Sequence, residues 1–299
     1  MTATFWNALM PAAPRLYRVE VDGITTRVLE AAPAHASADD ETTVLIHGAS
    51  GHLESFIFTL PYLAQTRRTV AFDLPWHGYA GYPERPFDVF DHAGFLARLV
   101  EVLELGKVAL VGQSLGGAIA ARATVERMLD VQRLVLIGSS GSTDGTPRDE
   151  RNSMRAALTG RSYEVVKARL EHAMTSRGPE MDELIECRYL AYQLGDWDQR
   201  VSAFTFHETP EGRRRATLTD AEWRRLTCPT LLIWGDEDRV VPVAAGRAIA
   251  ELVADSRLEV VTGAGHNPQF EQHELVNPIL SGFLHQSDVA PRLQGGASA

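Results

Sequence analysis

Short apolar runs alternate with longer stretches of helical periodicity over most of the chain. Because several of the short runs are apolar at every position, they indicate strands buried on both faces, as in a parallel sheet. The alternation of strand and helix predicts the α/β class with a doubly wound, mostly parallel sheet. The predicted strands lie at 44–48, 69–73, 107–112, 133–138, 229–235 and 258–263. The predicted helices lie at 54–65, 88–105, 115–128, 243–253 and within 271–285.

The N-terminal part carries a different pattern. From Tyr17 to Leu29, apolar and polar residues alternate on both sides of Asp22 and Gly23. An Asp-Gly pair between two alternating stretches is a strong signal for a β-hairpin. The two strands of this hairpin bring the predicted sheet to eight strands.

The alternation of strands and helices stops between residues 139 and 227. A small polar linker opens this segment, and several helical patterns follow without a convincing strand. Because the insertion is far longer than a simple crossover, we expect a helical lid, 139–227, over one end of the sheet. The core then consists of residues 1–138 and 228–285, and we expect the small polar tail 286–299 to be disordered.

The composition is that of an ordinary globular protein with an acidic balance. The chain has 299 residues and a formal net charge of −10 at pH 7. Its longest basic cluster, Arg213 to Arg215, lies in a segment that is also rich in acids, whereas nucleic-acid-binding domains normally carry a basic face. We therefore expect a small-molecule substrate and no nucleic acid, and a homodimer is left open.

The cysteines and the N-terminal residues indicate the cellular compartment in which the protein is expected. Cys187 and Cys228 are far apart and form no CxxC pair, as expected for reduced thiols in the cytoplasm. The first residues lack a basic region ahead of an apolar core, so they do not resemble a signal peptide. No window approaches the 18 continuous apolar residues of a membrane span, so we expect no membrane association.

A serine lies between two glycines where the strand 107–112 gives way to the helix 115–128. Gly112-Gln113-Ser114-Leu115-Gly116 matches the G-x-S-x-G motif in the strand–turn–helix context of a nucleophile elbow. Such a sharp turn crowds the positions two before and two after the serine, so only very small residues fit there. The alternative is a phosphate loop, but the lysine of a P-loop and the G-x-G-x-x-G pattern are both missing. The motif therefore predicts that Ser114 is a nucleophile.

A serine nucleophile needs a base and an acid that orients the base. His266 lies late in the chain in a glycine-rich loop after a predicted strand, whereas its rival His273 falls inside the last predicted helix. Asp238 follows the strand 229–235, and the chain order Ser, acid, His is the expected one. Asp236 is the runner-up for the acid, and its place suits a turn-forming residue better.

The attacked carbonyl must also find backbone N–H donors for its developing negative charge. One donor should be Leu115, at the N-terminus of the helix that follows the nucleophile, where unpaired N–H groups and the helix dipole converge. The other should come from the loop after the strand 44–48, and Ala49 is the best placed residue. We expect His47 to brace that loop rather than to act in catalysis.

Together, the motifs HGASG, DLPWHG, GQSLGG, WGDEDRVVP and GAGHNPQFE resemble those of the α/β-hydrolase superfamily over residues 16–285. The stretch ELIECRYLAYQ and the GAGHNPQFE ending are similar to the meta-cleavage-product hydrolases, which split a carbon–carbon bond in diketone acids formed by aromatic ring opening. This resemblance implies the α/β-hydrolase fold, no cofactor and no metal, and an Arg188 that points into the site and binds the dienoate end of the substrate. The alternative for Arg188 is a surface helix residue paired with Glu183 or Glu186.

Three positions depart from the pattern of the meta-cleavage-product hydrolases. The early loop HGASGHLESF is short and offers Ser55 or His52 in place of an asparagine. Gln113 stands where asparagine often precedes the nucleophile, and Asn267 stands where a tryptophan usually follows the catalytic histidine. Because the family uses these positions to shape its acid-binding pocket, we expect Ser55, Gln113 and Asn267 to bind substrate together with Arg188.

The sequence leaves three functions open. The leading hypothesis is a serine hydrolase that cleaves a carbon–carbon bond of a ring-cleavage-type keto or dienoic acid, as in aromatic catabolism. The second is a carboxylesterase or lactonase that acts on small esters through an acyl-enzyme. The third is a non-catalytic ligand-binding protein of the same fold, although such proteins often lose a triad member and this chain has all three. A dehalogenase or epoxide hydrolase would need an aspartate at position 114.

Overall fold

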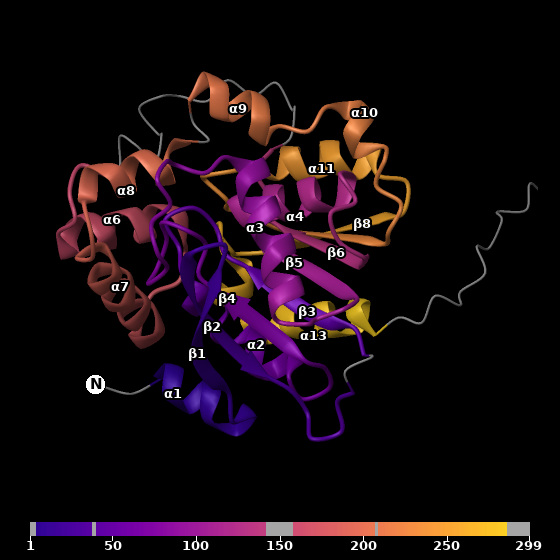
Figure 1. Ribbon diagram of the computed structural model, residues 1–299, viewed down its shortest axis with the longest axis horizontal. Helices are drawn as coiled ribbons and strands as arrows, with labels where there is room; N and C mark the ends of the chain where they lie inside the picture. The colour runs from indigo at the N-terminus through magenta and orange to yellow at the C-terminus, as the bar shows by residue number, and fades with distance from the viewer. Residues whose placement is uncertain (1–3, 38–39, 142–157, 207–208, 286–299) are drawn as a thin grey trace, which may run out of the picture.

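An eight-stranded sheet forms the centre of the computed structural model, which describes residues 4–37, 40–141, 158–206 and 209–285 (Figure 1). The strand order is β1-β2-β4-β3-β5-β6-β7-β8. The strands are β1 Arg15–Val21, β2 Ile24–Ala31, β3 Thr42–Ile46, β4 Thr69–Phe72, β5 Val108–Gln113, β6 Val131–Ile137, β7 Thr230–Gly235 and β8 Ser256–Val261.

Two kinds of pairing build this sheet. Strand β1 pairs antiparallel with β2, and β2 pairs antiparallel with β4, whereas every pairing from β4 through β8 is parallel. Asp22 and Gly23, which join β1 to β2, both have positive φ angles of 49° and 78°. These angles match the twist that a two-residue hairpin requires. The predicted hairpin and the mostly parallel eight-stranded sheet are both confirmed.

Helices cover both faces of the sheet, so the fold is doubly wound (Figure 1). Side chains of β3, β5 and β7 alternate between two cores: Leu45, Val111 and Ile233 face one layer of helices, and Val44, Leu110 and Leu232 face the other. The first layer consists of α2 Thr59–Leu63, α12 Pro268–Glu271 and α13 His273–Leu284. The second layer consists of α3 Val89–Val102, α4 Leu115–Val125 and α11 Val243–Leu252.

The chain between β6 and β7 forms a helical insertion, and its described residues contain no strand. Figure 1 shows α6, α7 and α8 grouped beside the sheet, while α9 and α10 lie near α3 and α11. The residues 142–157 of the predicted lid and the predicted disordered tail 286–299 lie outside the described residues. The helices of the insertion are α6 Tyr163–Ala173, α7 Pro179–Tyr192, α8 Trp197–Phe204, α9 Pro210–Ala216 and α10 Asp220–Trp223.

A fully buried arginine ties the insertion to the core. Arg200 of α8 donates to the carbonyls of Ala191 and Leu194 at the end of α7 and, over 3.2 Å, to the carbonyl of Gly78 in the loop after β4. A cation is well placed there because the last carbonyls of a helix carry partial negative charge. The end of α7 is thus fixed against the core by one side chain.

Two elements differ from the sequence-based prediction. The helix predicted at 54–65 is divided into a 3₁₀ turn, η2 Leu53–Phe56, and the short helix α2. Pro61 accounts for this break, because proline has no N–H and its ring clashes with the carbonyl four residues earlier. The N-terminal helix α1 Thr4–Leu9, followed by the 3₁₀ turn η1 Met10–Ala12, was not predicted, and it packs through buried Phe5 and Leu9.

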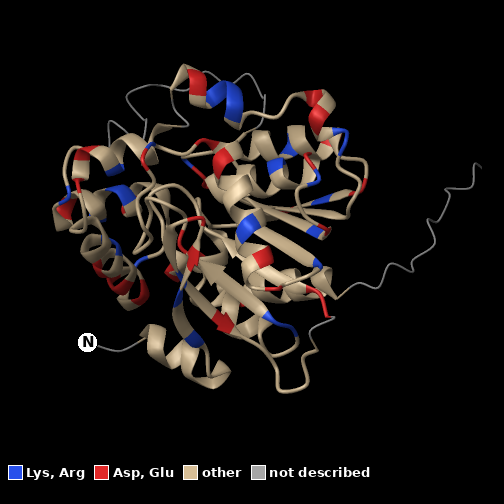
Figure 2. Cartoon of the chain, in the orientation of Figure 1, with Lys and Arg blue, Asp and Glu red and all other residues tan. Residues whose placement is uncertain are grey.

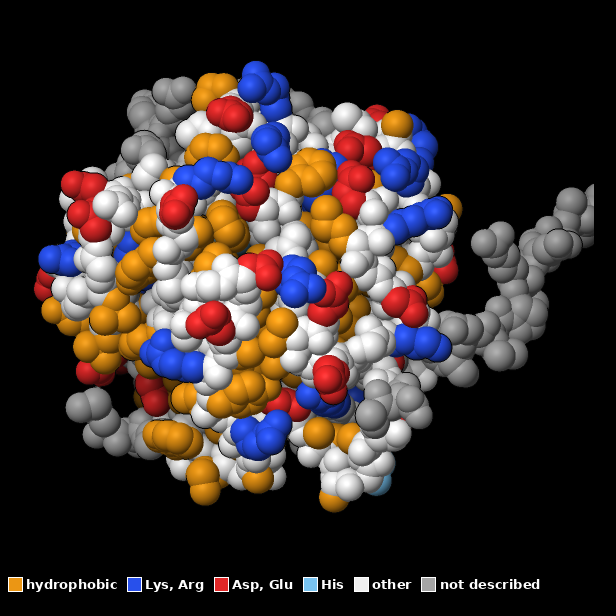
Figure 3. Space-filling view, in the orientation of Figure 1, with side chains coloured by type: hydrophobic (Ala, Val, Ile, Leu, Met, Phe, Trp, Pro, Cys, Tyr) orange, Lys and Arg blue, Asp and Glu red, His pale blue; other side chains and the backbone are white. Residues whose placement is uncertain are grey.

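Charged side chains of both signs are intermixed over the face drawn in Figures 2 and 3, with apolar side chains between them. Acidic residues occupy the first turn of α7, and arginines occupy the last turn of α9. Both placements complement the dipoles of these helices. In the described part of the chain, no helix is both long and apolar enough to span a bilayer.

Candidate active site

The three residues of the predicted triad follow three strands of the parallel part of the sheet. Ser114 comes directly after β5, Asp238 comes after β7 and His266 comes after β8. Strands β5 to β8 are parallel, so their carboxyl ends lie at one edge of the sheet, where ligands of open α/β sheets bind. The topology therefore brings the three segments to the same edge.

Ser114 has the strained backbone of a nucleophile elbow. Its φ of 53° and ψ of −116° lie in a region that residues with a side chain rarely adopt. A Cβ at Gly112 would clash with the carbonyl of Gly116, and a Cβ at Gly116 would clash with the carbonyl of Ile46. The two glycines are thus required by close backbone approach, as the motif predicts. The side chain of Ser114 is accessible, since this residue is half-buried between buried neighbours.

Asp238 is held in one orientation by its own loop. Its Oδ1 accepts hydrogen bonds from the N–H groups of Val240 and Val241 at 2.8 and 2.9 Å. Its Oδ2 lies 2.7 Å from Nδ1 of His266, and the carboxylate side chain is fully buried. A carboxylate can only accept here, so Nδ1 of His266 carries the proton and Nε2 keeps its lone pair. This is the tautomer that a general base of the triad type needs.

The two rivals of these residues point elsewhere. Asp236 is exposed, and its Oδ1 accepts a 2.7 Å hydrogen bond from the N–H of Gly263 in the turn after β8. The ring of His273 stacks on Phe58 at the start of α13, with 4.2 Å between ring centroids. Asp236 is therefore a turn-stabilising residue, and His273 belongs to the packing of the α2 and α13 layer.

The loop 263–267, here called the histidine loop, is fixed on both sides of His266. The N–H of His266 donates to the carbonyl of Ala173 at the end of α6, and its own carbonyl accepts from Gln113 Nε2 at 3.0 Å. Glu271 binds the flanking N–H groups: Oε2 accepts from Gly265 and Oε1 from Asn267. Both backbone groups of His266 and the N–H groups on either side of it are thus hydrogen-bonded, which fixes the position of the ring.

Glu271 also connects the histidine loop to the insertion. Its Oε2 accepts from both the N–H and the Oγ1 of Thr175, at 2.6 and 2.8 Å. Thr175 follows α6, and its single hydroxyl proton is shared between Glu271 and the carbonyl of Gly263. One carboxylate therefore holds the loop of the candidate base and the end of α6 together. Sequence reasoning did not single out Glu271, although it lies five residues after His266 within the GAGHNPQFE motif.

The hydroxyl of Ser114 forms no hydrogen bond with another described residue. The residues next to Ser114 in the chain, however, contact the histidine loop and the end of β6. Gln113, the preceding residue, binds the carbonyl of His266. The N–H of Ser140 donates to the carbonyl of Ser114, so the end of β6 borders the same turn. A nucleophile–base contact is often long in a ligand-free site and tightens only when substrate binds.

The two N–H groups predicted for an oxyanion hole, those of Leu115 and Ala49, belong to segments that border Ser114. Leu115 is the first residue of α4, whose leading N–H groups have no partner within the helix. Among the described residues, nothing accepts a hydrogen bond from the N–H of Leu115 or of Ala49. Both groups are thus available to a ligand oxygen. Ala49 is half-buried in the loop after β3.

His47 braces the start of the loop 47–56, here called the oxyanion loop. Its Nε2 accepts from the N–H of Leu74 at 3.0 Å, so its Nδ1 is the protonated nitrogen and donates to the carbonyl of Gly48 at 2.8 Å. Burial lowers the pKa of His47 to about 3, which keeps the ring neutral. Both ring nitrogens are occupied, so His47 has a structural role.

A buried ion-pair network lies beneath the oxyanion loop. Arg27 of β2 binds both oxygens of Glu54 at 2.8 and 2.7 Å and also contacts Asp73 after β4. Asp73 in turn accepts from the N–H of Leu53 at 2.8 Å. Burial alone would raise the pKa of Glu54, but His52 and Arg27 lower it, so the carboxylate stays ionised. Sequence reasoning missed this network, although Glu54 and Asp73 lie in or beside quoted motifs.

Arg188 is buried, and its Nη2 lies 3.5 Å from Oγ of Ser55. In the described residues it forms no ion pair, and burial lowers the pKa of its guanidinium. The alternative of a surface residue paired with Glu183 or Glu186 is therefore wrong. The signal for burial was present in the sequence, because Arg188 continues the apolar stripe of α7 formed by Met181, Leu184, Ile185, Ala191 and Tyr192.

The other three predicted substrate-binding residues, Ser55, Gln113 and Asn267, lie in two regions. Ser55 stands beside Arg188 in the oxyanion loop. Gln113 uses its amide N–H on the histidine loop, so it braces His266 in addition to bordering Ser114. Asn267 is half-buried, and Gln269 lies 3.5 Å from its Oδ1. The structure thus brings Ser55 to Arg188, while Gln113 and Asn267 belong to the histidine side.

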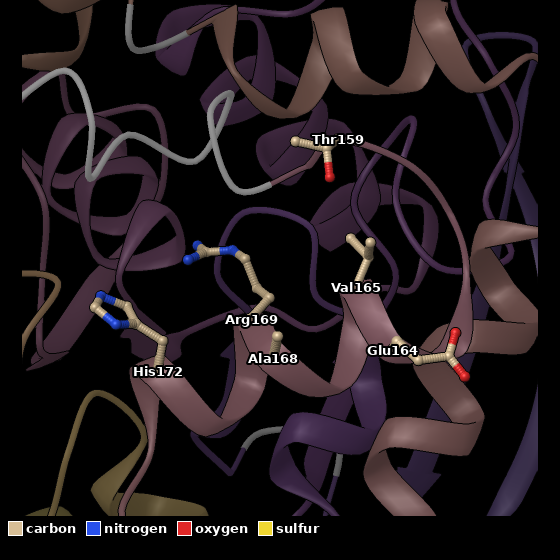
Figure 4. A pocket seen from close by; sticks show the side chains of 6 residues that line it. All are labelled: Thr159, Glu164, Val165, Ala168, Arg169 and His172. Carbon is tan, nitrogen blue, oxygen red and sulfur yellow. The ribbon is translucent and has the colours of Figure 1, made fainter.

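A pocket of about 320 Å³ lies outside this constellation, along the less buried face of α6 (Figure 4). Five of its six lining residues come from that helix, and the loop before it supplies the sixth. The pocket includes none of the predicted site residues. Its lining residues are Thr159, Glu164, Val165, Ala168, Arg169 and His172.

The chain is similar to several known hydrolases. The chain is 29% identical over 274 residues to a 2-hydroxymuconate semialdehyde hydrolase of Pseudomonas sp. strain CF600, covering 86% of this chain and 91% of that protein. It is 26% identical over 270 residues to a monoacylglycerol lipase of Bos taurus, covering 84% and 78% of the two chains. A solved 2-hydroxy-6-oxo-6-phenylhexa-2,4-dienoate hydrolase from Rhodococcus sp. strain RHA1 superposes with a TM-score of 0.80 at 22% identity, covering 91% and 99%.

The sequence profile described as alpha/beta hydrolase fold matches residues 43–272, most of the chain. The resemblance inferred from the motifs, including the likeness to hydrolases of ring-cleavage products, is confirmed by these relatives. The chain belongs to the alpha/beta hydrolase fold family.

Proposed function

We propose that the protein is a serine hydrolase in which Ser114 is the nucleophile, His266 the general base and Asp238 the acid that orients it. The observation that carries the proposal is the buried 2.7 Å contact between Asp238 Oδ2 and His266 Nδ1 at the sheet edge where Ser114 occupies a strained elbow. A His–carboxylate pair beside an accessible, strained serine is the arrangement that activates a hydroxyl.

The catalytic cycle follows from these roles. As Oγ of Ser114 attacks the substrate carbonyl carbon, His266 Nε2 takes the hydroxyl proton, and Asp238 stabilises the imidazolium that forms. The carbonyl oxygen becomes an oxyanion and accepts hydrogen bonds from the N–H groups of Ala49 and Leu115. When the scissile bond breaks, the imidazolium returns the proton to the leaving group. Water, deprotonated by the same histidine, then releases the acyl group from Ser114.

For the substrate, the leading proposal is a ring-cleavage-type keto or dienoic acid whose carbon–carbon bond is cleaved. Arg188 supports it, because a buried guanidinium with no carboxylate partner among the described residues favours an anionic ligand. Two relatives named above are hydrolases of such compounds. The dienol would first shift to its keto tautomer by moving its hydroxyl proton to the carbon of the scissile bond, so that the fragment leaves as a stabilised dienolate and takes its proton from the imidazolium. The inserted helices would act as a lid that excludes water from this fragment.

The alternative is a carboxylesterase or lactonase that uses the same groups on small esters. The relative named a monoacylglycerol lipase, almost as similar as the ring-cleavage relative, favours it. So does the engagement of Gln113 with the histidine loop, since that amide N–H is already occupied. In this case Arg188 would not be needed for turnover.

The deciding experiment compares a ring-fission dienoate with a short-chain p-nitrophenyl ester, using the wild type, Ser114→Ala and the control Ser281→Ala on α13. We expect Ser114→Ala to lose about four to six orders of magnitude in kcat on the preferred substrate, with unchanged circular dichroism and the control fully active. Turnover by Ser114→Ala would refute the site. Turnover of the ester alone would replace the carbon–carbon proposal with the esterase, and binding without turnover of either would indicate a ligand-binding protein.

A further inference from the structure

Strand β8 forms one edge of the sheet, and no strand among the described residues pairs with its outer side. It lies at the end of the sheet remote from α6, α7 and α8, and α11 packs beside it (Figure 1). An open edge strand can pair with another chain, and proteins commonly prevent this with prolines, bulges or charged side chains. β8 contains no proline, and its pairing with β7 is regular along the whole strand. Only its charged side chains remain to be considered.

The hydrogen bonds to β7 determine which backbone groups of β8 point outward. The carbonyls of Asp255 and Val261, at the two ends of the strand, accept hydrogen bonds from the β7 side. Because residues alternate in direction along a strand, the backbone groups of Ser256, Leu258 and Val260 point away from β7. Among the described residues, no backbone group binds their N–H and C=O groups. Three residues of β8 thus each present a donor and an acceptor to a further strand.

The side chains of β8 are divided between its two faces. Arg257 and Glu259 share one face, where Nε and Oε1 are 3.0 Å apart and the side chains are 49% and 37% exposed. On the other face, Leu258 is half-buried against the core layer of α11, and Val260 is 41% exposed. The edge therefore carries two accessible charges of opposite sign, placed symmetrically about Leu258.

We propose that two copies of this chain associate by antiparallel pairing of their β8 strands, about a two-fold axis at Leu258. The two sheets then form one continuous sheet, and the interface is isologous, because the same strand serves on both sides. In this arrangement Leu258 meets Leu258 of the other copy, and Ser256 meets Val260. All three pairs are hydrogen-bonded pairs, since these are the residues whose backbone groups point outward. The inference does not depend on the proposed function.

The charges of β8 select this register. A partner strand can be shifted only in steps of two residues, because outward-pointing groups must meet outward-pointing groups. Centred on Leu258, the pairing places Arg257 of each copy opposite Glu259 of the other. One step in either direction places Arg257 opposite Arg257, or Glu259 opposite Glu259. Opposite charges across a strand pair stabilise it and like charges destabilise it, so the centred register is the favourable one of the three.

Charged side chains on an edge strand usually oppose association, and so does the net charge of −10 on each copy. On β8, however, the two charges become complementary when the strand is paired with itself. The two copies of β8 run in opposite directions, so the carboxyl ends of the two sheets lie at opposite edges of the joined sheet. The edge that carries Ser114 and His266 is therefore left open in both copies, and we expect association to leave turnover unchanged.

The first test measures association of the full chain by sedimentation velocity from about 0.1 to about 100 μM. We expect the wild type to form a dimer, with twice the chain mass of 32.9 kDa. Arg257→Glu places like charges opposite each other at two positions of the dimer, so it should weaken dimerisation about tenfold or more. A wild type that stays monomeric over this range overturns the proposal.

The matched control is Arg18→Glu on β1, the other edge strand of the sheet. Arg18 is also exposed and also lies two residues before a glutamate, Glu20. We expect this variant to dimerise like the wild type, and circular dichroism should show both variants folded. Equal weakening by Arg18→Glu and Arg257→Glu would mean that dimerisation responds to net charge alone, which contradicts the role of β8.

The second test examines the register by mixing two variants. At the two charged positions of β8, Arg257→Glu has only acidic side chains and Glu259→Arg only basic ones. Each variant alone should therefore associate poorly, whereas their mixture should form a heterodimer about as stable as the wild-type dimer, because every cross-strand pair again has opposite charges. Two folded variants that form no heterodimer contradict the proposed pairing.

If the variants do not fold, hydrogen exchange of the wild type still decides. Exchange is compared by mass spectrometry at concentrations where the monomer or the dimer dominates. The N–H groups of Ser256, Leu258 and Val260 should exchange more slowly in the dimer, while peptides from β1 should exchange alike in both states. A dimer in which β8 exchanges as fast as in the monomer overturns the proposal, because the copies then associate through another surface.

Discussion

The histidine loop and the oxyanion loop flank the same serine, yet they differ in how their polar groups are satisfied. Around His266, both ring orientation and backbone are fixed by short hydrogen bonds to Asp238, Glu271, Ala173 and Gln113. Around His52 and Arg188, several buried polar atoms have no hydrogen-bond partner within the part of the chain that the structure describes. Under the proposed function, this difference corresponds to a division of labour: the proposed catalytic groups are oriented in advance by the protein, whereas the groups proposed to bind the ligand are completed by it.

The largest effect on kcat should come from removing the carboxylate that orients His266. Asp238→Asn places an amide where the carboxylate orients His266, and we expect a loss of about 10⁴ in kcat because the imidazole adopts the wrong tautomer. Asp236→Asn is the matched control, since its side chain binds only the turn at Gly263, and it should remain within a few-fold of the wild type. Steady-state kinetics on the preferred substrate check both variants. A greater loss for Asp236→Asn would move the acid to that position.

The next largest effect should come from a substitution of Arg188, beside the oxyanion loop. Arg188→Met should lower kcat/KM for a carboxylate substrate about 10²-fold, from the loss of a charge-assisted hydrogen bond, and leave a neutral ester within about threefold of the wild type. It should also raise the melting temperature of the ligand-free protein, because a buried cation that forms no ion pair with any described residue is replaced by an apolar side chain of similar length. Equal losses on both substrates, or a lower melting temperature, would show that Arg188 is needed for structure.

A third measurement uses His47, which starts the oxyanion loop but is fully paired. Its folded pKa of about 3 lies below the unfolded value near 6.5, so the unfolded state binds the extra proton between these values. The stability from this group is therefore complete above pH 6.5 and is lost as pH falls toward 3, by about 2 kcal/mol between pH 7 and pH 5. Urea unfolding at the two pH values should show this decrease, and His47→Gln should show about 2 kcal/mol less of it. An unchanged difference in His47→Gln would mean that other groups cause the pH dependence.

The smallest effect concerns Glu271, which positions the candidate base without touching substrate. Glu271→Ala releases the N–H groups of Gly265, Asn267 and Thr175, and we expect about a tenfold loss in kcat with little change in KM. Glu271→Gln keeps acceptor oxygen and should recover part of the loss. Glu274→Ala, an exposed neighbour in the first turn of α13, is the control. A change in KM alone would point to the insertion rather than to His266.

Much of the fold was predictable because local patterns determine it. Buried parallel strands are apolar at nearly every position, and the glycines at 112 and 116 are demanded by contacts a few residues away or one strand away. The positions of Ser114, Asp238 and His266 after three parallel strands could be predicted because each motif follows an apolar run. The break of the predicted helix at Pro61 could also have been read from the sequence, since proline interrupts a helix wherever it falls in its interior.

What the sequence could not predict are contacts between distant segments. Glu271 meets Thr175 and Glu54 meets Arg27 across the fold, and no periodicity marks an acid as the partner of one remote group rather than another. The burial of Arg188 could be predicted only in part. Its position on the apolar stripe of α7 was visible, but a stripe alone does not tell whether the long side chain ends in solvent or in a cavity.

The hydrogen bonds of Ala173 and Thr175 to the histidine loop have a consequence for recombining this protein with its relatives. One way to change the substrate preference of such a hydrolase is to replace its inserted helices with those of a homologue. In this chain, a replacement segment must also place the carbonyl of position 173 within reach of the His266 N–H. It must carry a hydroxyl at position 175 and direct it, with the N–H of that residue, toward Glu271. Chimaeras that ignore these two positions would change turnover and selectivity at once, and the two effects would be hard to tell apart.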